Sequence, residues 1–156
     1  MKNTSEVTID LMINADLPEI MAIERESFPS PWTVGMFTGE LNSSHSVCLV
    51  ARINVKGKSV IGAYIIFWFV ADEVHLHNLA VKKEYKKQGI AFQLMEVMRE
   101  IAGKNEITAQ TLEVRKSNIE AIKLYQKCGF VVKGIRPLYY TDTHEDALIM
   151  WADIKQ

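Results

Sequence analysis

The sequence predicts an α/β (α+β) fold, a mixed and mostly antiparallel sheet of seven strands with about four helices on both faces. Three observations lead to this prediction. Segments with the alternating period of strands are interleaved with segments that repeat every 3.6 residues or so, as amphipathic helices do. Three successive strand segments are joined by short turns, which indicates an antiparallel meander. A helical segment joins two strands between residues 73 and 114, and such a crossover produces one parallel pair.

Seven segments have the character of strands. They cover residues 7–13, 47–55, 59–70, 73–81, 107–114, 130–139 and 147–154. In the first segment Val7, Ile9, Leu11 and Ile13 recur at every second position, which predicts one buried face. Gly57 lies between the second and third strands, where a tight turn favours a residue that adopts positive φ.

The first predicted helix follows the first strand. Asn14 or Asp16 can cap it, and Pro18 fits its first turn, where a missing N–H group costs nothing. Four residues then follow at helical spacing: Leu17, Ile20, Met21 and Glu24. The helix ends at the proline-containing segment Phe28–Trp32.

Three further helices are expected over residues 33–41, 90–104 and 117–127. Ser117 and Glu120 form a capping-box pair at the start of the last helix. Gly129 suits the left-handed exit from that helix.

Composition indicates a single globular domain over residues 1–156, because no repeat, linker or low-complexity stretch interrupts the chain. Basic residues number 18 and acidic residues 19, and the net charge of −1 argues against nucleic acid or an acidic membrane as a partner. The longest apolar run, Val60–Ala71, is well short of the roughly 20 residues that a membrane-spanning helix needs. With no signal peptide evident and only Cys48 and Cys128, a cytoplasmic protein is expected.

One candidate site follows the strand that ends at Val81. A basic loop containing Lys86 and Lys87 leads to Gly89, and a helix begins immediately after it. The first turn of a helix has unpaired N–H groups and partial positive charge, so this arrangement could hold a diphosphate. The alternative is that Gly89 serves a tight turn and the lysines are a solvated surface. The loop lacks the glycine patterns of dinucleotide-binding and Walker loops, and spacing alone leaves both interpretations open.

Glu113 and Tyr125 are the candidate acid–base residues. Glu113 interrupts an apolar strand, and burial there would make its carboxylate a stronger base. Tyr125 shares a helix face with Ile122, and its hydroxyl could donate a proton. An exposed sheet position for Glu113 and a core position for Tyr125 are the alternatives, and each is about as common as the functional role.

These segments together resemble the GCN5-related N-acetyltransferase (GNAT) family. The family signature, Gln or Arg followed by x-x-Gly-x-Gly/Ala, is similar to Lys86–Ala91 here, except that lysine stands at the first position. Lysine keeps the positive charge but lacks the planar guanidinium, so a diphosphate would depend more on backbone amides. The stretches Leu112–Phe130 and Ile135–Ala147, with the Phe28–Trp32 segment, resemble the RimI-type subgroup, which acetylates the N-terminal alanine of a ribosomal protein.

The resemblance implies acetyl-CoA as co-substrate and assigns residues to it. The backbone of Leu79, Ala80 and Val81 would contact the acetyl and pantetheine groups, and Asn118 would contact the cofactor near its thioester. The diphosphate would be held by Lys86, Lys87, Gln88, Gly89, Ile90, Ala91 and Phe92.

The resemblance also implies the roles around the reacting amine. Glu113 would be the general base and Tyr125 the general acid, with direct transfer and no covalent acyl-enzyme. Tyr139 and Tyr140 would line the entry for a peptide N-terminus. Phe28 and Trp32 would belong to the substrate loop, although packing in or around the core is the commoner role for such residues.

The expected function is therefore transfer of an acetyl group from acetyl-CoA to the N-terminal α-amine of a protein, most simply that of a ribosomal protein. The alternatives are a GNAT enzyme that acetylates a small amine or a lysine, and a non-catalytic CoA-binding module.

No metal is expected, because His75 and His77 share a strand face but have no third ligand at suitable spacing. Bordering the substrate channel is the other role for the two histidines. Cys128, at a helix end that raises a thiol pKa, is expected to be structural, and the chain to be a monomer or weak dimer.

Overall fold

The computed structural model describes residues 6–155, which form seven strands, four α-helices and two 3-10 helices. The strands are β1 (Val7–Leu11), β2 (Ser46–Val55), β3 (Lys58–Val70), β4 (Glu73–Val81), β5 (Ala109–Arg115), β6 (Val131–Tyr140) and β7 (Glu145–Asp153). The helices are α1 (Leu17–Ser27), α2 (Val34–Leu41), α3 (Ile90–Lys104) and α4 (Ile119–Lys127), with the 3-10 helices η1 (Asn14–Asp16) and η2 (Lys83–Tyr85). The predicted order of elements is confirmed.

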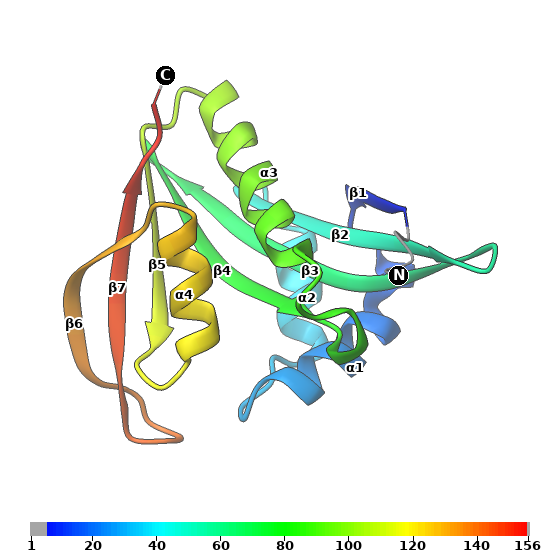
Figure 1. Cartoon of the computed structure of the whole chain (residues 1–156), viewed down its shortest axis with the longest axis horizontal. Helices are drawn as coiled ribbons and strands as arrows, with labels where there is room; N and C mark the ends of the chain where they lie inside the picture. The colour runs from blue at the N-terminus through cyan, green and yellow to red at the C-terminus, as the bar shows by residue number, and fades with distance from the viewer. Residues whose placement is uncertain (1–5, 156) are drawn as a thin grey trace. The chain divides into compact units, whose positions relative to one another are not determined.

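The strands form one sheet in the order β1-β2-β3-β4-β5-β7-β6 (Figure 1). β2, β3 and β4 are neighbours in chain order, as a meander requires. β4 and β5 pair in parallel, with Glu73 opposite Ala109, whereas β5–β7 and β6–β7 are antiparallel. The predicted fold class and the parallel pair made by the crossover are therefore confirmed.

The chain divides into two compact units. The first contains the described part of Met1–Ile66 together with Asn78–Leu94, and the second contains Phe67–His77 and the described part of Met95–Gln156.

The core of the first unit lies between α1, α2 and the strands β2 and β3. Leu17, Ile20 and Met21, three of the four residues predicted at helical spacing, are buried there, as is the whole ring of Phe37 on α2. Phe37 packs edge-on against Tyr64 with ring centroids 5.7 Å apart. Burying each such side chain contributes about 1.5–3 kcal/mol to folding, so the apolar stripe of α1 fixes the helix on the sheet.

The buried face predicted for the first strand is partly wrong. Val7 and Ile9 are half-buried, but Leu11 is 66% and Ile13 53% exposed, while Met12 is buried. The strand stops at Leu11, and the chain turns into η1, so the alternation of faces does not continue through residue 13.

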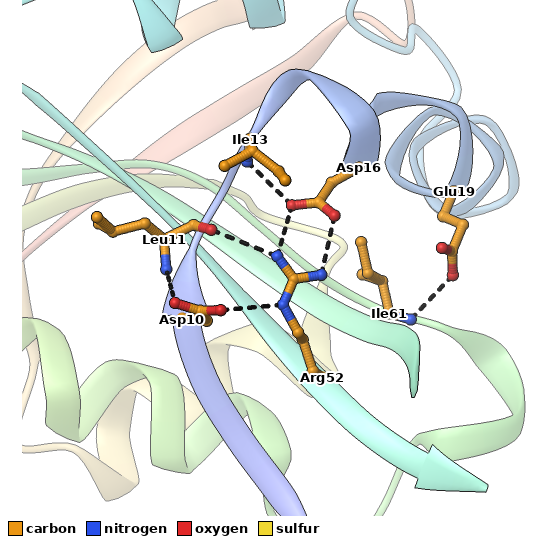
Figure 2. A network of polar contacts seen from close by, with 7 residues as sticks. All are labelled: Asp10, Leu11, Ile13, Asp16, Glu19, Arg52 and Ile61. Atoms are coloured by element: carbon orange, nitrogen blue, oxygen red, sulfur yellow. Dashed lines mark hydrogen bonds and ion pairs between the residues drawn. The ribbon is translucent and has the colours of Figure 1, made fainter. Parts of the chain in front are cut away.

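Asp16 is the N-cap residue of α1, as predicted, but its side chain makes no capping hydrogen bond to that helix. Its carboxylate accepts the Ile13 N–H at 2.9 Å and is bound by both terminal nitrogens of Arg52, at 2.8 and 2.9 Å (Figure 2). Arg52 Nε also donates to Asp10 at 3.2 Å, so one guanidinium joins β2, β1 and the start of α1. Pro18 does lie in the first turn of α1, as predicted.

The start of α4 corrects a second predicted cap. The N-cap residue is Asn118, whose Oδ1 accepts the Ala121 N–H at 3.2 Å, instead of Ser117. Ser117 lies one residue too early, and its own N–H donates to Glu145 at 3.1 Å. The exit from α4 is as predicted, because Gly129 has φ of 92°.

The hairpin turn between β2 and β3 also follows the prediction. Lys56 and Gly57 have φ of 50° and 82°, the left-handed pair that a two-residue hairpin turn requires. Asn54 Oδ1 accepts the Gly57 N–H at 3.0 Å and so stabilises the turn. None of the helices in residues 6–155 is both long and apolar enough to cross a membrane.

Candidate active site

The residues assigned to acetyl-CoA by resemblance lie mainly in the first unit. Leu79, Ala80 and Val81 are the last residues of β4, and the chain passes through η2 into an exposed turn. Lys82 N–H donates to Gly62 O at 2.7 Å, which holds the end of β4 beside β3. The backbone that precedes the turn is therefore fixed by the sheet.

The turn before α3 has two left-handed residues, Lys87 with φ of 63° and Gly89 with φ of 81°. The first hydrogen bond of the helix runs from Gln93 N–H to Gly89 O at 3.0 Å, so the amides of Ile90 and Ala91 have no intrahelical acceptor. A Cβ placed on Gly89 would meet nothing within 4 Å, which means that the space beside this backbone is open.

This turn fits an anion. Lys86, Lys87, Gln88 and Gly89 are all exposed, and α3 with 15 residues places its positive end at the turn. A diphosphate could approach the backbone at Gly89 because no side chain blocks it.

The candidate base lies in the second unit. Glu113 is on β5, and its side chain is 29% exposed, so the full burial that the apolar strand suggested is not present. The register pairs Glu113 with Ile149 of β7 and Ile149 with Gly134 of β6, which places all three on one sheet face. Arg136, two residues after Gly134, is on the same face and reaches across to Glu113 with Nη2 and Oε1 3.6 Å apart.

An irregularity in β6 brings the tyrosine pair to this carboxylate. The ladder with β7 shifts between Arg136 and Tyr140, where Leu138 has φ of 51° and donates its N–H to Asp146 Oδ1 at 2.9 Å. In a regular strand, Tyr139 and Tyr140 would point to opposite faces. Here their rings meet edge-to-face at 5.1 Å.

Both tyrosines interact with Glu113, and each interaction raises the pKa of the tyrosine. A hydrogen bond from its hydroxyl to Glu113, together with partial burial, raises the pKa of Tyr139. Burial and then the charge of Glu113 raise the pKa of Tyr140 to about 12. Arg115 covers the Tyr140 ring at 4.1 Å, and its own position is fixed by a bidentate bond to Asp142. The predicted pair Tyr139 and Tyr140 therefore lies beside the predicted base.

Tyr125 is on α4 of the same unit, where it packs against Phe130 with ring centroids 6.1 Å apart. It is 8% exposed, and burial together with its neighbours Tyr140 and Cys128 raises the pKa of its hydroxyl well above the ordinary value. Within residues 6–155 no hydrogen bond is made by this hydroxyl, and because every wholly buried polar side-chain atom there has a partner, the hydroxyl keeps some contact with solvent. Tyr125 therefore stays protonated at neutral pH, and its proton is not committed to another group.

The remaining candidates are partly engaged in structural contacts. Asn118 Oδ1 is used to cap α4. Phe28 and Trp32 are half-buried against the core of the first unit, and Trp32 lies 5.2 Å from the Phe37 ring. Core packing is thus part of their role.

The described contacts of the two histidines and of Cys128 are structural. His75 Nε2 is 2.8 Å from Glu73 and its ring stacks on His77, which in turn lies against Trp68 with centroids 3.9 Å apart. In the described residues no three His, Cys, Asp or Glu side chains come together as a metal site. The predicted direction for Cys128 is confirmed, because burial and the nearby Glu96 raise its pKa to about 11.

Sequence reasoning missed Arg136 and Arg115 as parts of this site. Arg115 ends β5 and Arg136 lies inside β6, and only the strand register distinguishes the two from ordinary surface cations. Pro137 inside a predicted strand was the available sign of the irregularity, because proline cannot donate to a ladder.

Comparison with known proteins identifies the family of this chain. The model of the Acetyltransferase (GNAT) family matches residues 17–130. The ribosomal protein bS18-alanine N-acetyltransferase of Escherichia coli (strain K12) is 35% identical over 145 residues, which cover 92% of this chain and 95% of that protein. The protein of the same name from Salmonella typhimurium is 31% identical over 145 residues, with the same coverage of 92% and 95%.

A solved structure is similar over nearly the whole chain. The crystal structure of the ribosomal-protein-S18-alanine N-acetyltransferase from Escherichia coli has a TM-score of 0.84 and 33% identity, and covers 97% of this chain and 96% of its own. The chain belongs to the GNAT family of acetyl-CoA-dependent N-acetyltransferases.

Proposed function

We propose that this enzyme acetylates the N-terminal α-amine of a protein, with the N-terminal alanine of ribosomal protein bS18 as the acceptor. The proposal is supported by similarity over more than nine-tenths of the chain to proteins that carry this activity in their names. It treats residues 1–156 as one N-acetyltransferase domain that acts in the cytoplasm, where ribosomal proteins are made. A monomer or weak dimer, without metal or nucleic acid, is sufficient for this reaction.

The observation that carries the proposal is the cluster around Glu113. A half-exposed carboxylate, two tyrosines and an arginine meet on one sheet face, and Tyr140 is electrostatically coupled both to Glu113 and to Tyr125. A carboxylate that solvent reaches can accept a proton, and a buried protonated phenol can donate one. These are the two proton transfers that amide formation from an amine and a thioester requires.

In the proposed mechanism acetyl-CoA supplies an acyl group on a sulfur leaving group. Glu113, directly or through one water, removes a proton from the acceptor ammonium so that the nitrogen lone pair can form the new C–N bond. Tyr125 donates its proton to the departing sulfur as the C–S bond breaks. The nitrogen releases its second proton to solvent as the amide forms, and solvent carries the proton of Glu113 to the Tyr125 phenolate, so the enzyme is regenerated.

The backbone of Leu79–Val81 would orient the acyl and pantetheine groups. Residues Lys86–Phe92 would bind the diphosphate through the open backbone at Gly89, the first amides of α3 and the exposed lysines. Because lysine replaces the usual first residue of the signature, Lys86 would contribute charge without a bidentate contact. Asn118 would contact the cofactor near its thioester in addition to capping α4.

The acceptor would enter beside Tyr139 and Tyr140, with Phe28 and Trp32 contributing from the substrate loop. The pKa of an α-amine is about 7.7–8.0, against about 10.4 for a lysine side chain. A useful fraction of the α-amine is therefore neutral near pH 7, and a carboxylate base suffices for it. A lysine acceptor would demand roughly 2.5 pKa units more.

The test is release of free thiol from acetyl-CoA in the presence of three acceptors. They are a peptide that begins with alanine, the same peptide with a blocked α-amine and an internal lysine, and spermidine. Turnover on the free alanine terminus alone is expected. Turnover confined to spermidine or to the blocked peptide would refute the N-terminal assignment while leaving the family assignment intact.

A further inference from the structure

A carboxylate that the proposed reaction does not use lies inside the first unit. Glu24 is on the buried side of α1 and is only 1% exposed. Burying an ionised carboxylate is unfavourable unless a cation or several hydrogen bonds compensate it. Within residues 6–155 the structure pairs Glu24 with no cation, and hydrogen bonds alone compensate for its burial.

Three donors converge on this carboxylate. Oε1 accepts from the Tyr64 hydroxyl at 2.6 Å and from Asn78 Nδ2 at 2.7 Å, and Oε2 accepts from the Trp32 N–H at 3.0 Å. A carboxylate satisfies all three because both of its oxygens are acceptors. A glutamine has one acceptor oxygen and an NH₂ group, so at least one of the three donors would face another donor.

Glu24 holds both ends of the segment Phe28–Trp32. Its main-chain oxygen accepts the Phe28 N–H at 3.2 Å, and its side chain accepts the Trp32 N–H. Between them, Pro29 and Pro31 have no N–H to donate. The five residues are thus closed into a loop on a single residue of α1.

The same carboxylate reaches the strand assigned to acetyl-CoA. Asn78 immediately precedes Leu79 on β4, so one buried group contacts both the loop and that strand. The two attachments differ in importance. β4 is also held by its neighbours in the sheet, whereas within residues 6–155 no other side chain accepts the Trp32 N–H.

We propose that Glu24 is a positioning residue for the acceptor, which fixes the segment Phe28–Trp32 in the conformation that receives the peptide N-terminus. This inference rests on the proposed function, because it is there that Phe28 and Trp32 are assigned to the acceptor. Glu24 does not touch the reacting atoms. Its loss should weaken acceptor binding and leave the proton transfers at Glu113 and Tyr125 unchanged.

The test compares Glu24→Gln with Tyr64→Phe. Both variants remove hydrogen bonds from the buried network and lower Tm, but only Glu24→Gln changes the group that faces the Trp32 N–H: when the remaining oxygen stays with Tyr64 and Asn78, the NH₂ group takes the place of Oε2. For Glu24→Gln we expect the KM of the alanine peptide to rise about tenfold or more, with kcat and the KM of acetyl-CoA within about twofold. Tyr64→Phe should leave all three constants within about twofold. If Glu24→Gln does not fold, Glu24→Asp, whose shorter carboxylate cannot reach all three donors, carries the same expectation.

Amide hydrogen exchange provides a second measurement that needs no turnover. Exchange in the peptide containing Trp32 should accelerate in Glu24→Gln and stay unchanged in Tyr64→Phe. Equal increases in peptide KM in both variants, or unchanged KM and unchanged exchange in Glu24→Gln, would overturn the inference. A wild-type enzyme that fails to acetylate the alanine peptide would instead refute the proposed function, and the exchange experiment separates that result from failure of the inference.

Discussion

Tyr125→Phe should separate catalysis from stability. The substitution removes one hydroxyl from a ring that is 8% exposed, and no hydrogen bond within residues 6–155 is lost with it. The free energy of unfolding should therefore change by less than about 0.5 kcal/mol. The transfer rate should fall about 10²–10⁴-fold, the usual contribution of a general acid, which corresponds to roughly 3–5 kcal/mol in the barrier.

Tyr64→Phe is the matched control for this prediction. It removes the same atom from a fully buried tyrosine, and that hydroxyl donates to the Glu24 carboxylate at 2.6 Å. A hydrogen bond to a charged acceptor contributes about 1.5–3 kcal/mol, so Tm should fall by about 3–12 °C for a domain of this size. The transfer rate should remain near that of the wild type.

Two assays decide the comparison, thermal unfolding by circular dichroism and thiol release at saturating acetyl-CoA with the alanine peptide. We expect opposite effects in the two variants: Tyr125→Phe should keep its Tm and lose transfer rate, whereas Tyr64→Phe should lose Tm and keep its transfer rate. A Tyr125→Phe enzyme that keeps the full rate would refute the assignment of the general acid. A large loss of stability in that variant would mean that its hydroxyl is engaged in the folded protein.

Three more predictions follow from the same geometry. Glu113→Gln should lose rate mainly below neutral pH and recover above about pH 8, where the α-amine is already neutral; a uniform loss across a pH–rate profile would contradict the role of base. Gly89→Ala should raise the Kd of acetyl-CoA, measured by calorimetry, without changing the KM of the acceptor. An alanine at φ of 81° costs about 1–2 kcal/mol, and its Cβ would occupy the open space beside the turn. The pKa of Asp16 is lowered: burial opposes this, but hydrogen bonds from Arg52 and Ile13 outweigh it. The stabilising contribution of Asp16 is therefore complete above the unfolded-state pKa of about 3.9 and is lost as pH falls through the lower pKa of the folded state. In Asp16→Asn, the free energy of unfolding measured with urea should therefore fall less steeply between about pH 5 and 2 than in the wild type. An unchanged acid limb would mean that another group controls it.

The fold was predictable because its signals are local. The two-residue turns at Lys56–Gly57 and after Val70, the glycine exit from α4 and the uninterrupted periodicity over 90–104 each specify an element without reference to the rest of the chain. The errors occur where an element ends. The alternating pattern continues to Ile13, past the end of β1 at Leu11, and Ser117 has the residue type of a cap but lies one residue before the actual N-cap.

The surroundings of the candidate site were less predictable because they depend on register. Glu113 and Tyr125 could be singled out by residue type, yet nothing in the sequence places Arg136 two strands away from Glu113 on the same face. Glu24 did give a signal, since it is the one charged residue among the four that share the helical spacing of α1. A carboxylate on an apolar stripe implies a set of donors, but the donors lie 8, 40 and 54 residues away.

The irregular part of β6 shows why such a site departs from an ideal hairpin. A regular ladder with β7 would be the more stable arrangement, since a non-glycine residue at φ of 51°, as Leu138 is, costs on the order of 1–2 kcal/mol. A regular ladder would, however, direct only one of two consecutive tyrosines to the face of Glu113. With the shift, Tyr139 donates a hydrogen bond to Glu113, and Tyr140 lies close enough for the charge of Glu113 to raise its pKa. The Asp146 carboxylate stabilises the strained backbone by accepting the Leu138 N–H. The local loss of stability is thus tied to the one feature of the hairpin that the proposed acceptor entry uses, the presence of two tyrosines beside one base.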